Sequence, residues 1–227
     1  MGQVFSDLFY PDNPKRRAKV VRMMQNMYDY MQSNFRATNK LTDFLNENID
    51  GTNFSHIAVD ENKSLKDNSN LLIGRIEEAQ AIIEKIDKEL AEKLDPGLYR
   101  NLKDVDLSFQ DRMETAQKAT HVVTGVVITV AAIAVCVAIA SGGILAPVVA
   151  VLGALATSAI ATTVISIIGG LGIGMIVGAI TGAIERDQLE DAISQLETQL
   201  NTFGPASLAY TESIYEVLAE LRIYELQ

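Results

Sequence analysis

The side chains that most often carry enzyme chemistry are scarce and scattered in this sequence. His56 and His121 lie far apart, and neither has a neighbouring cluster of metal-ligand residues. Cys136 is the only cysteine, which excludes an internal disulfide framework and a multi-cysteine zinc site, and its apolar surroundings are typical of an inert thiol. No HExxH, GxSxG, P-loop or CxxC motif is present. We therefore expect no enzymatic activity, no cofactor and no metal site.

The most distinctive pattern is a series of glycines at every fourth position in the segment GLGIGMIVGAITG, residues 170–182. It lacks the GxGxxG spacing of a dinucleotide site. Each glycine costs about 0.5–1 kcal/mol relative to alanine inside a helix, so a water-exposed helix is not expected to keep four in phase. In lipid, small residues let two helix backbones approach closely, and close contact is what drives helix association there. We predict a helix-packing face, within one chain or between chains, that comprises Ser158, Thr162, Ser166, Gly170, Gly174, Gly178 and Gly182.

These glycines belong to a run of 66 residues, 119–184, that contains no Asp, Glu, Lys or Arg. About 20 apolar residues span a bilayer as a helix, so the run has room for two or three crossings. Its strongest helix-breaking cluster consists of Ser141, Gly142, Gly143 and Pro147, which separates candidate spans of about 122–140 and 148–168. We predict a membrane hairpin with this cluster at its tip. The competing interpretation is a buried helix pair in the core of a soluble bundle.

Amphipathic helices are expected on both sides of the run. Asn13-Pro14 is a good helix start, and apolar positions recur at steps of three and four from Val20 to Leu45. A polar loop to about residue 70 precedes a heptad helix that ends at Asp95-Pro96-Gly97. A third helix starts near Leu98 and is expected to enter the apolar run as one rod.

The C-terminal segment repeats the heptad pattern from Leu189 to Tyr224, with Gly204-Pro205 predicted to kink or split it. The fold class predicted is all-α: an elongated antiparallel helical bundle or coiled coil with an apolar membrane hairpin. Three regions follow from this interpretation. They are an N-terminal helical coiled-coil region at 1–120, a membrane-inserting hairpin at 121–184, and a C-terminal coiled-coil region at 185–227 that packs on the first.

Charge and short motifs give further expectations about partners and compartment. The net charge of -10 argues against a nucleic-acid partner, and the N-terminus has no apolar signal-peptide core, which favours cytosolic synthesis. Gly2 in MGQVFS fits the myristoylation pattern, and the basic residues at 15–19 offer a second membrane signal. Asn53 and Asn62 begin glycosylation sequons, which matter only on a lumenal side. The two kinds of modification imply different compartments, so the choice stays open.

The chain resembles the vertebrate family called single-pass membrane and coiled-coil domain-containing protein 3. The resemblance rests on FYPDNPKRR (9–17), NKLT (39–42), LYRNL (98–102), GIGMIVGAI (172–180) and QLEDAI (188–193). It implies a membrane protein with helical coiled-coil flanks and no enzymatic role. The family name implies one crossing, whereas the uncharged run has room for two.

Two functions remain open at this point. The first is a membrane-inserting protein whose partners are the lipid bilayer and further copies of itself, associated through the glycine face to form a pore. Its architecture is analogous to helical pore-forming toxins, in which a bundle shelters an apolar hairpin before insertion. The second is a permanently anchored tether whose coiled-coil regions recruit a protein partner.

Overall fold

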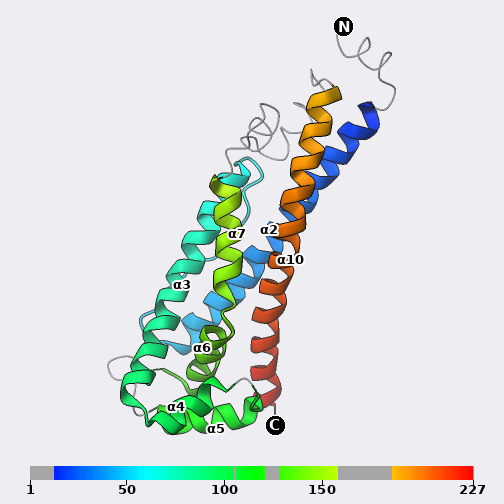
Figure 1. The fold of residues 1–227 in the computed structure, drawn as a ribbon. Coiled ribbons are helices and arrows are strands. Elements are labelled where there is room, and N and C mark those ends of the chain that lie inside the picture. Colours follow the sequence, from blue (N-terminus) through cyan, green and yellow to red (C-terminus); the bar gives the residue numbers. More distant parts are fainter. Residues whose placement is uncertain (1–12, 105, 121–127, 158–185, 227) are drawn as a thin grey trace. The chain divides into compact units, whose positions relative to one another are not determined.

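The computed structural model describes residues 13–104, 106–120, 128–157 and 186–226, and within these ranges the secondary structure is helical (Figure 1). The expected all-α class is therefore confirmed. The helices are α2 (Asn13–Asn48), α3 (Leu65–Lys93), α4 (Pro96–Lys103), α5 (Phe109–Ala119), α6 (Val130–Gly142), α7 (Leu145–Thr157) and α10 (Arg186–Glu225).

The contacts divide the chain into two compact units, each assembled from three separate segments. The first comprises residues 1–35, 58–73 and 148–208, and the second comprises 36–57, 74–147 and 209–227. Each unit thus draws on all three of the regions expected at 1–120, 121–184 and 185–227. The compact units form because segments distant in the sequence pair with one another. A division of the chain into consecutive regions by composition does not reproduce them.

The apolar stripes predicted for α2 and α3 are buried. In α2 the buried positions are Val20, Met24, Met27, Met31, Phe35, Thr38, Leu41 and Leu45, none more than 2 % exposed. In α3 they are Leu72, Ile76, Ala79, Ile83, Ile86 and Leu90, none more than 4 % exposed. The helical periodicity of the sequence therefore identifies the inward faces of both helices.

Helix α3 begins at Leu65, earlier than the expected start near residue 70. Ser64 caps it, because its Oγ accepts a hydrogen bond from the Asp67 backbone N–H at 3.1 Å. Asn68 and Ser69 made this stretch look like a loop, yet both side chains are fully buried. The Asn68 amide donates to the carbonyl groups of Asp60 and Ser64, so this first turn anchors the preceding segment.

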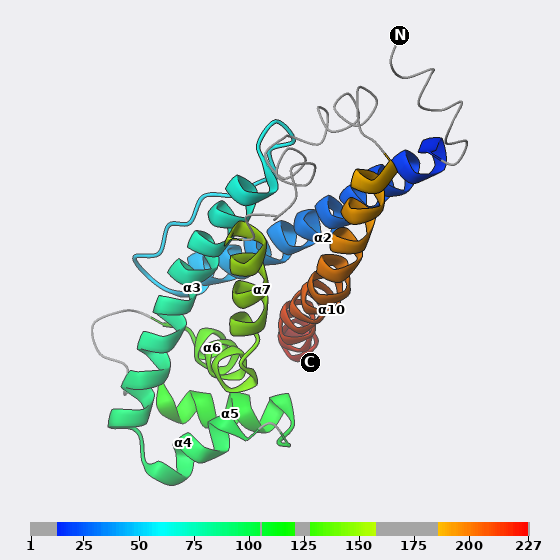
Figure 2. The same cartoon turned by 45° about the horizontal axis from the view of Figure 1, so that its top comes forward.

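Within the first unit, α2 and α10 run parallel, and both views show their N-terminal ends side by side (Figure 1, Figure 2). Arg16 pairs with Glu190 at 2.8 Å, and further along both helices the Ser207 hydroxyl donates to Asn34 Oδ1 at 2.7 Å. The antiparallel arrangement expected from the sequence is therefore wrong for this pair. A heptad stripe identifies the buried face of a helix, but it does not determine whether the helix runs parallel or antiparallel to its neighbour.

Helix α10 continues through Gly204-Pro205, so the prediction of a split helix is wrong. Proline removes one backbone hydrogen bond, but Phe203 and Ser207 on either side are buried and hold the helix against its neighbours. Gly204 lies against the Tyr30 ring, and a Cβ added there would come within 3.2 Å of Tyr30 Cε2. Gly204 is thus a point of close approach.

The rod expected from Leu98 into the apolar run is also wrong, because two separate helices occupy its start. Helix α4 ends at Lys103, where Asp104 adopts an extended backbone, and Ser108 caps α5 by accepting from the Asp111 N–H at 3.2 Å. Asp95 caps α4, as its Oδ1 accepts from the Gly97 N–H at 2.9 Å. The Ser-x-x-Asp spacing at 108–111 is a helix-start signal that the sequence analysis passed over.

In the second unit, two asparagine side chains of α2 hold an extended segment that belongs to no helix. Asn39 donates to the Ile57 carbonyl at 2.8 Å and accepts from its N–H at 3.0 Å. Asn46 makes the same pair of bonds to Phe54, at 2.9 and 2.8 Å. A primary amide offers one donor and one acceptor side, as a peptide unit does. We call these two residues the asparagine clamp.

Candidate functional site

Helix α6 belongs to the second unit and is buried on all of its faces. Eight consecutive residues, Ala132–Ile139, are each at most 8 % exposed, and α6 contacts both α4 and α5. Every residue from Val130 to Ile139 is apolar, so the helix has no polar side to turn toward water. A helix that is apolar all round belongs in a protein core or a membrane.

The start of α6 is held by the end of α2. Thr129 caps α6 by accepting from the Ala132 N–H at 3.1 Å, and its hydroxyl donates to Asn48 Oδ1 at 2.7 Å. The Thr129 N–H also donates to the Asn48 carbonyl at 3.1 Å, and Ile49 and Ile128 form an isolated antiparallel bridge. These contacts between distant segments have no sequence signature, so Asn48 and Thr129 could not be identified from the sequence.

The end of α6 agrees with the expected position of the hairpin tip. The helix ends at Gly142, and Gly143 adopts a left-handed conformation with φ of 60°, which favours glycine. Ser141 belongs to the last turn of α6, and Pro147 to the first turn of α7, where proline is tolerated. The predicted break is therefore confirmed, although the helices begin at Val130 and Leu145 rather than at about 122 and 148.

Length limits what either helix can do alone in a membrane. Each has 13 residues, or about 20 Å at 1.5 Å per residue, against a hydrocarbon thickness of about 30 Å. In the described part of the chain no single helix combines enough length and apolar character to span a bilayer. Only Val130–Gly142 and Leu145–Ala156, counted together across their bend, meet that criterion.

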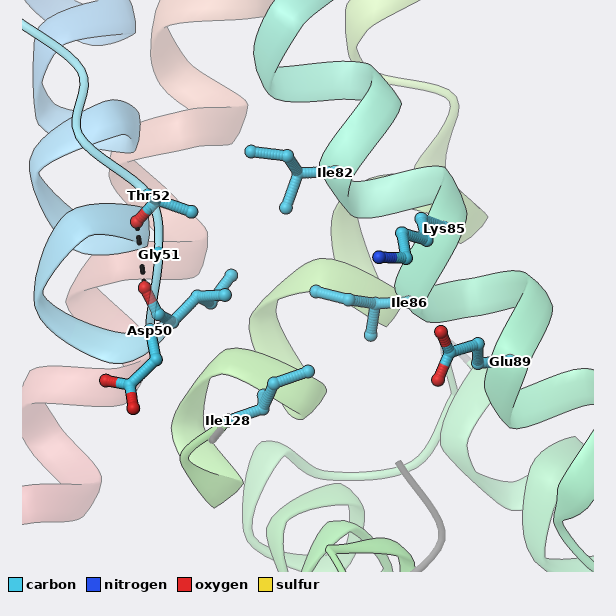
Figure 3. A pocket seen from close by; sticks show the side chains of 9 residues that line it. Asp50, Gly51, Thr52, Ile82, Lys85, Ile86, Glu89 and Ile128 are labelled. Atoms are coloured by element: carbon cyan, nitrogen blue, oxygen red, sulfur yellow. Dashed lines mark hydrogen bonds between the residues drawn. The ribbon is translucent and has the colours of Figure 1, made fainter. Parts of the chain in front are cut away.

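A pocket of about 310 Å³ opens beside the start of α6 (Figure 3). Four isoleucines contribute its apolar surface: Ile49, Ile82, Ile86 and Ile128. Gly51 forms part of the wall and lies in the turn after α2 with φ of 85°, a conformation that favours glycine. The charged residues of the lining are Asp50, Lys85 and Glu89, and none of them was expected from the sequence to line a site.

The titratable and nucleophilic side chains named in the sequence analysis form no catalytic cluster in the described ranges. Cys136 is fully buried within α6. His56 lies in the segment held by the asparagine clamp, with its Nε2 2.6 Å from Asp43 Oδ1. No group of three or more His, Cys, Asp and Glu that could hold a metal ion occurs among the residues described. His121 lies outside them.

Two buried tyrosine hydroxyls have structural roles. Burial, with Glu61, Asp60 and Asp67 adding repulsion, raises the pKa of Tyr28 to about 12, and its hydroxyl donates to the Lys63 carbonyl at 3.0 Å. Burial likewise raises the pKa of Tyr210, whose hydroxyl shares a hydrogen bond of 2.8 Å with Thr38 Oγ1. Both stay protonated near neutral pH.

Comparison with known protein families shows to which family the chain belongs. A family described as a protein of unknown function, DUF4533, matches residues 16–177, which is most of the chain. The chain belongs to the DUF4533 family. No solved structure matches it. The matched part of the chain includes α2 from residue 16 and all of α3 to α7, and therefore the buried helix, the break at Gly143 and the isoleucine pocket.

Several expected sites of the DUF4533 protein lie outside the described residues. These are Gly2 and the whole small-residue face at Ser158, Thr162, Ser166, Gly170, Gly174, Gly178 and Gly182. The two sequons are described. Asn53 and Ser55 are both exposed, whereas the Ser64 hydroxyl of the Asn62 sequon is engaged in capping α3. The geometry thus favours Asn53 over Asn62 as an acceptor.

Proposed function

We propose that this protein shelters an apolar hairpin within its helical units, inserts it into a membrane and self-associates there. The observation that carries the proposal is the burial of α6. This helix has no polar face, and its residues Ala132–Ile139 are all buried within the protein. The resemblance to single-pass membrane and coiled-coil proteins supports the same assignment to a membrane.

The free energy of moving α6 from protein into lipid supports this mechanism. Protein core and lipid tails are both apolar, so the hydrophobic contribution of α6 is largely kept after transfer. A single charged residue at the centre of a membrane helix costs about 2.5–3.5 kcal/mol, and residues 119–184 contain none. Release of α6 from the protein must break the polar contacts at the start of the helix, where Thr129 bonds to Asn48.

Self-association in the membrane is the part of the proposal that rests on sequence. Gly170, Gly174, Gly178 and Gly182 would place a smooth face on the apolar segment that follows the second candidate span, and an identical face on another copy could pack against it. Several hairpins packed in this way would surround a pore. The competing function is a permanently anchored tether that recruits a protein partner.

A reversible covalent lock at the start of α6 tests the sheltering step. The variant Asn48→Cys with Thr129→Cys, in a Cys136→Ala background, joins two residues that already share hydrogen bonds. When oxidised, this protein should neither insert into liposomes nor release trapped dye, and reduction should restore both. The two single-cysteine variants are controls that cannot form the internal bond. Equal insertion by locked and reduced protein would refute sheltering.

The glycine face is tested in the same liposomes. Gly174→Leu with Gly178→Leu should retain membrane binding but lose chemical crosslinking and dye release, because larger side chains keep the helix backbones apart. Ile176→Leu, at a position outside the four-residue glycine series, is the matched control. A parent chain that stays in membranes and never releases dye would favour the tether.

A further inference from the structure

The isoleucine pocket beside the start of α6 combines an apolar wall with a single available positive charge. We propose that it binds the anion of a medium-chain fatty acid, with the chain on the isoleucines and the carboxylate at Lys85. This proposal is independent of membrane insertion, because it requires only the folded second unit.

The apolar wall fits a short hydrocarbon chain. Ile49, Ile86 and Ile128 are buried, while Ile82 is half-buried, and the four residues belong to three separate segments of the chain. Figure 3 shows Ile82, Ile86 and Ile128 around the open space. The volume of about 310 Å³ is roughly twice that of an engineered 150 Å³ cavity that binds benzene. By this comparison the pocket has room for about twelve non-hydrogen atoms, which is a carboxylate with about ten carbons.

The charge at the pocket determines which head group it prefers. Figure 3 shows the Lys85 side chain with its ammonium directed over Ile86 into the open space. Glu89, one turn along α3, already pairs with Lys93 at 3.3 Å. Within the described ranges no carboxylate lies within 4 Å of Lys85 Nζ.

The other charge in the lining does not compete for the ligand head. Asp50, from the opposite wall, points away from the space in Figure 3. An anion is therefore favoured at Lys85, and a hydrogen bond between two charged groups is stronger than one between neutral groups. An alkyl alcohol of the same length keeps the apolar contacts but loses this attraction, and an alkylammonium adds repulsion.

The test uses decanoate as the probe and the isoleucine methyl groups as reporters. The full chain, labelled at isoleucine methyls, is titrated by NMR near neutral pH at concentrations where decanoate is monomeric. Saturable shifts are expected at Ile49, Ile82, Ile86 and Ile128. Shifts spread over Ile139, Ile193 and Ile214 as well would indicate general hydrophobic binding and overturn the proposal, as would the absence of saturable shifts at millimolar decanoate.

Charge variants separate a specific head-group contact from simple partitioning. Lys85→Gln should weaken decanoate binding about tenfold, and Lys85→Glu should reverse the preference toward decylammonium. Lys88→Gln is the matched control, because Lys88 is an exposed lysine on the same helix that does not line the pocket. Both Lys85 variants are at an exposed position, so folding is retained. Unchanged decanoate affinity in Lys85→Gln would overturn the assignment of the head group.

Discussion

Helices α3 and α6 are buried in different ways, and the difference separates what a sequence pattern can and cannot determine. Along α3, buried residues alternate with exposed ones at heptad spacing, so Ile83 is 1 % exposed while Ala81 faces solvent. Along α6, residues two positions apart are equally buried, as Ile133 and Val135 show at 0 %. Helix α3 therefore has one buried face and one solvent-exposed face, whereas all faces of α6 are buried.

The contrast shows that periodicity reports on the boundary between two environments. An amphipathic helix lies at such a boundary, and its stripe identifies the face that is buried. A helix with apolar residues all round carries no such stripe, and protein core and lipid tails satisfy it equally well. Composition alone therefore could not decide whether residues 130–142 lie in a protein core or in a membrane.

The largest expected effects come from placing a charge on opposite sides of α6. Ile133→Asp and Val135→Asp should each lower the free energy of unfolding by about 3–5 kcal/mol, because both sites bury an unpaired carboxylate. Chemical denaturation of the full chain, followed by circular dichroism, measures the loss. A small effect at either position would mean that one face of α6 meets water.

An asymmetric effect is expected for the corresponding pair on α3, where only one of the two variants should be strongly destabilised. Ile83→Asp should cost about as much as the α6 variants, whereas Ala81→Asp should cost less than about 1 kcal/mol, since it changes only helix propensity. Each pair is separated by two residues and thus by the same rotation around its helix. Equal losses at 81 and 83 would remove the distinction between the two helices.

Much of the helical framework could be predicted from the residues. Asn13-Pro14 begins α2, the apolar stripes of α2 and α3 are the buried faces, and Gly142-Gly143 ends α6. These features depend on local chemistry: capping, periodicity, and glycine at a left-handed position. The predicted membrane-packing face from Ser158 to Gly182 stays a prediction.

The direction of α10 and the isoleucine pocket could not be predicted, because both depend on contacts between distant segments. Heptads in α2 and α10 are compatible with either orientation, and the parallel pairing follows from matches such as Asn34 with Ser207. The pocket requires the end of α2, the middle of α3 and Ile128 to meet. Lys85 has an ordinary solvated position in the heptad, so no local signal marks it.

The asparagine clamp constrains where this chain can vary in length. Asn39 and Asn46 are seven helical residues apart, about 10.5 Å, and the residues they hold, Ile57 and Phe54, are three extended residues apart, about 10 Å. The two spacings agree only at this residue count. An insertion or deletion between Phe54 and Ile57 would therefore release one end of the clamp, whereas the connection between Ile57 and α3 can change length without disturbing this match. Relatives that differ in loop length should differ there.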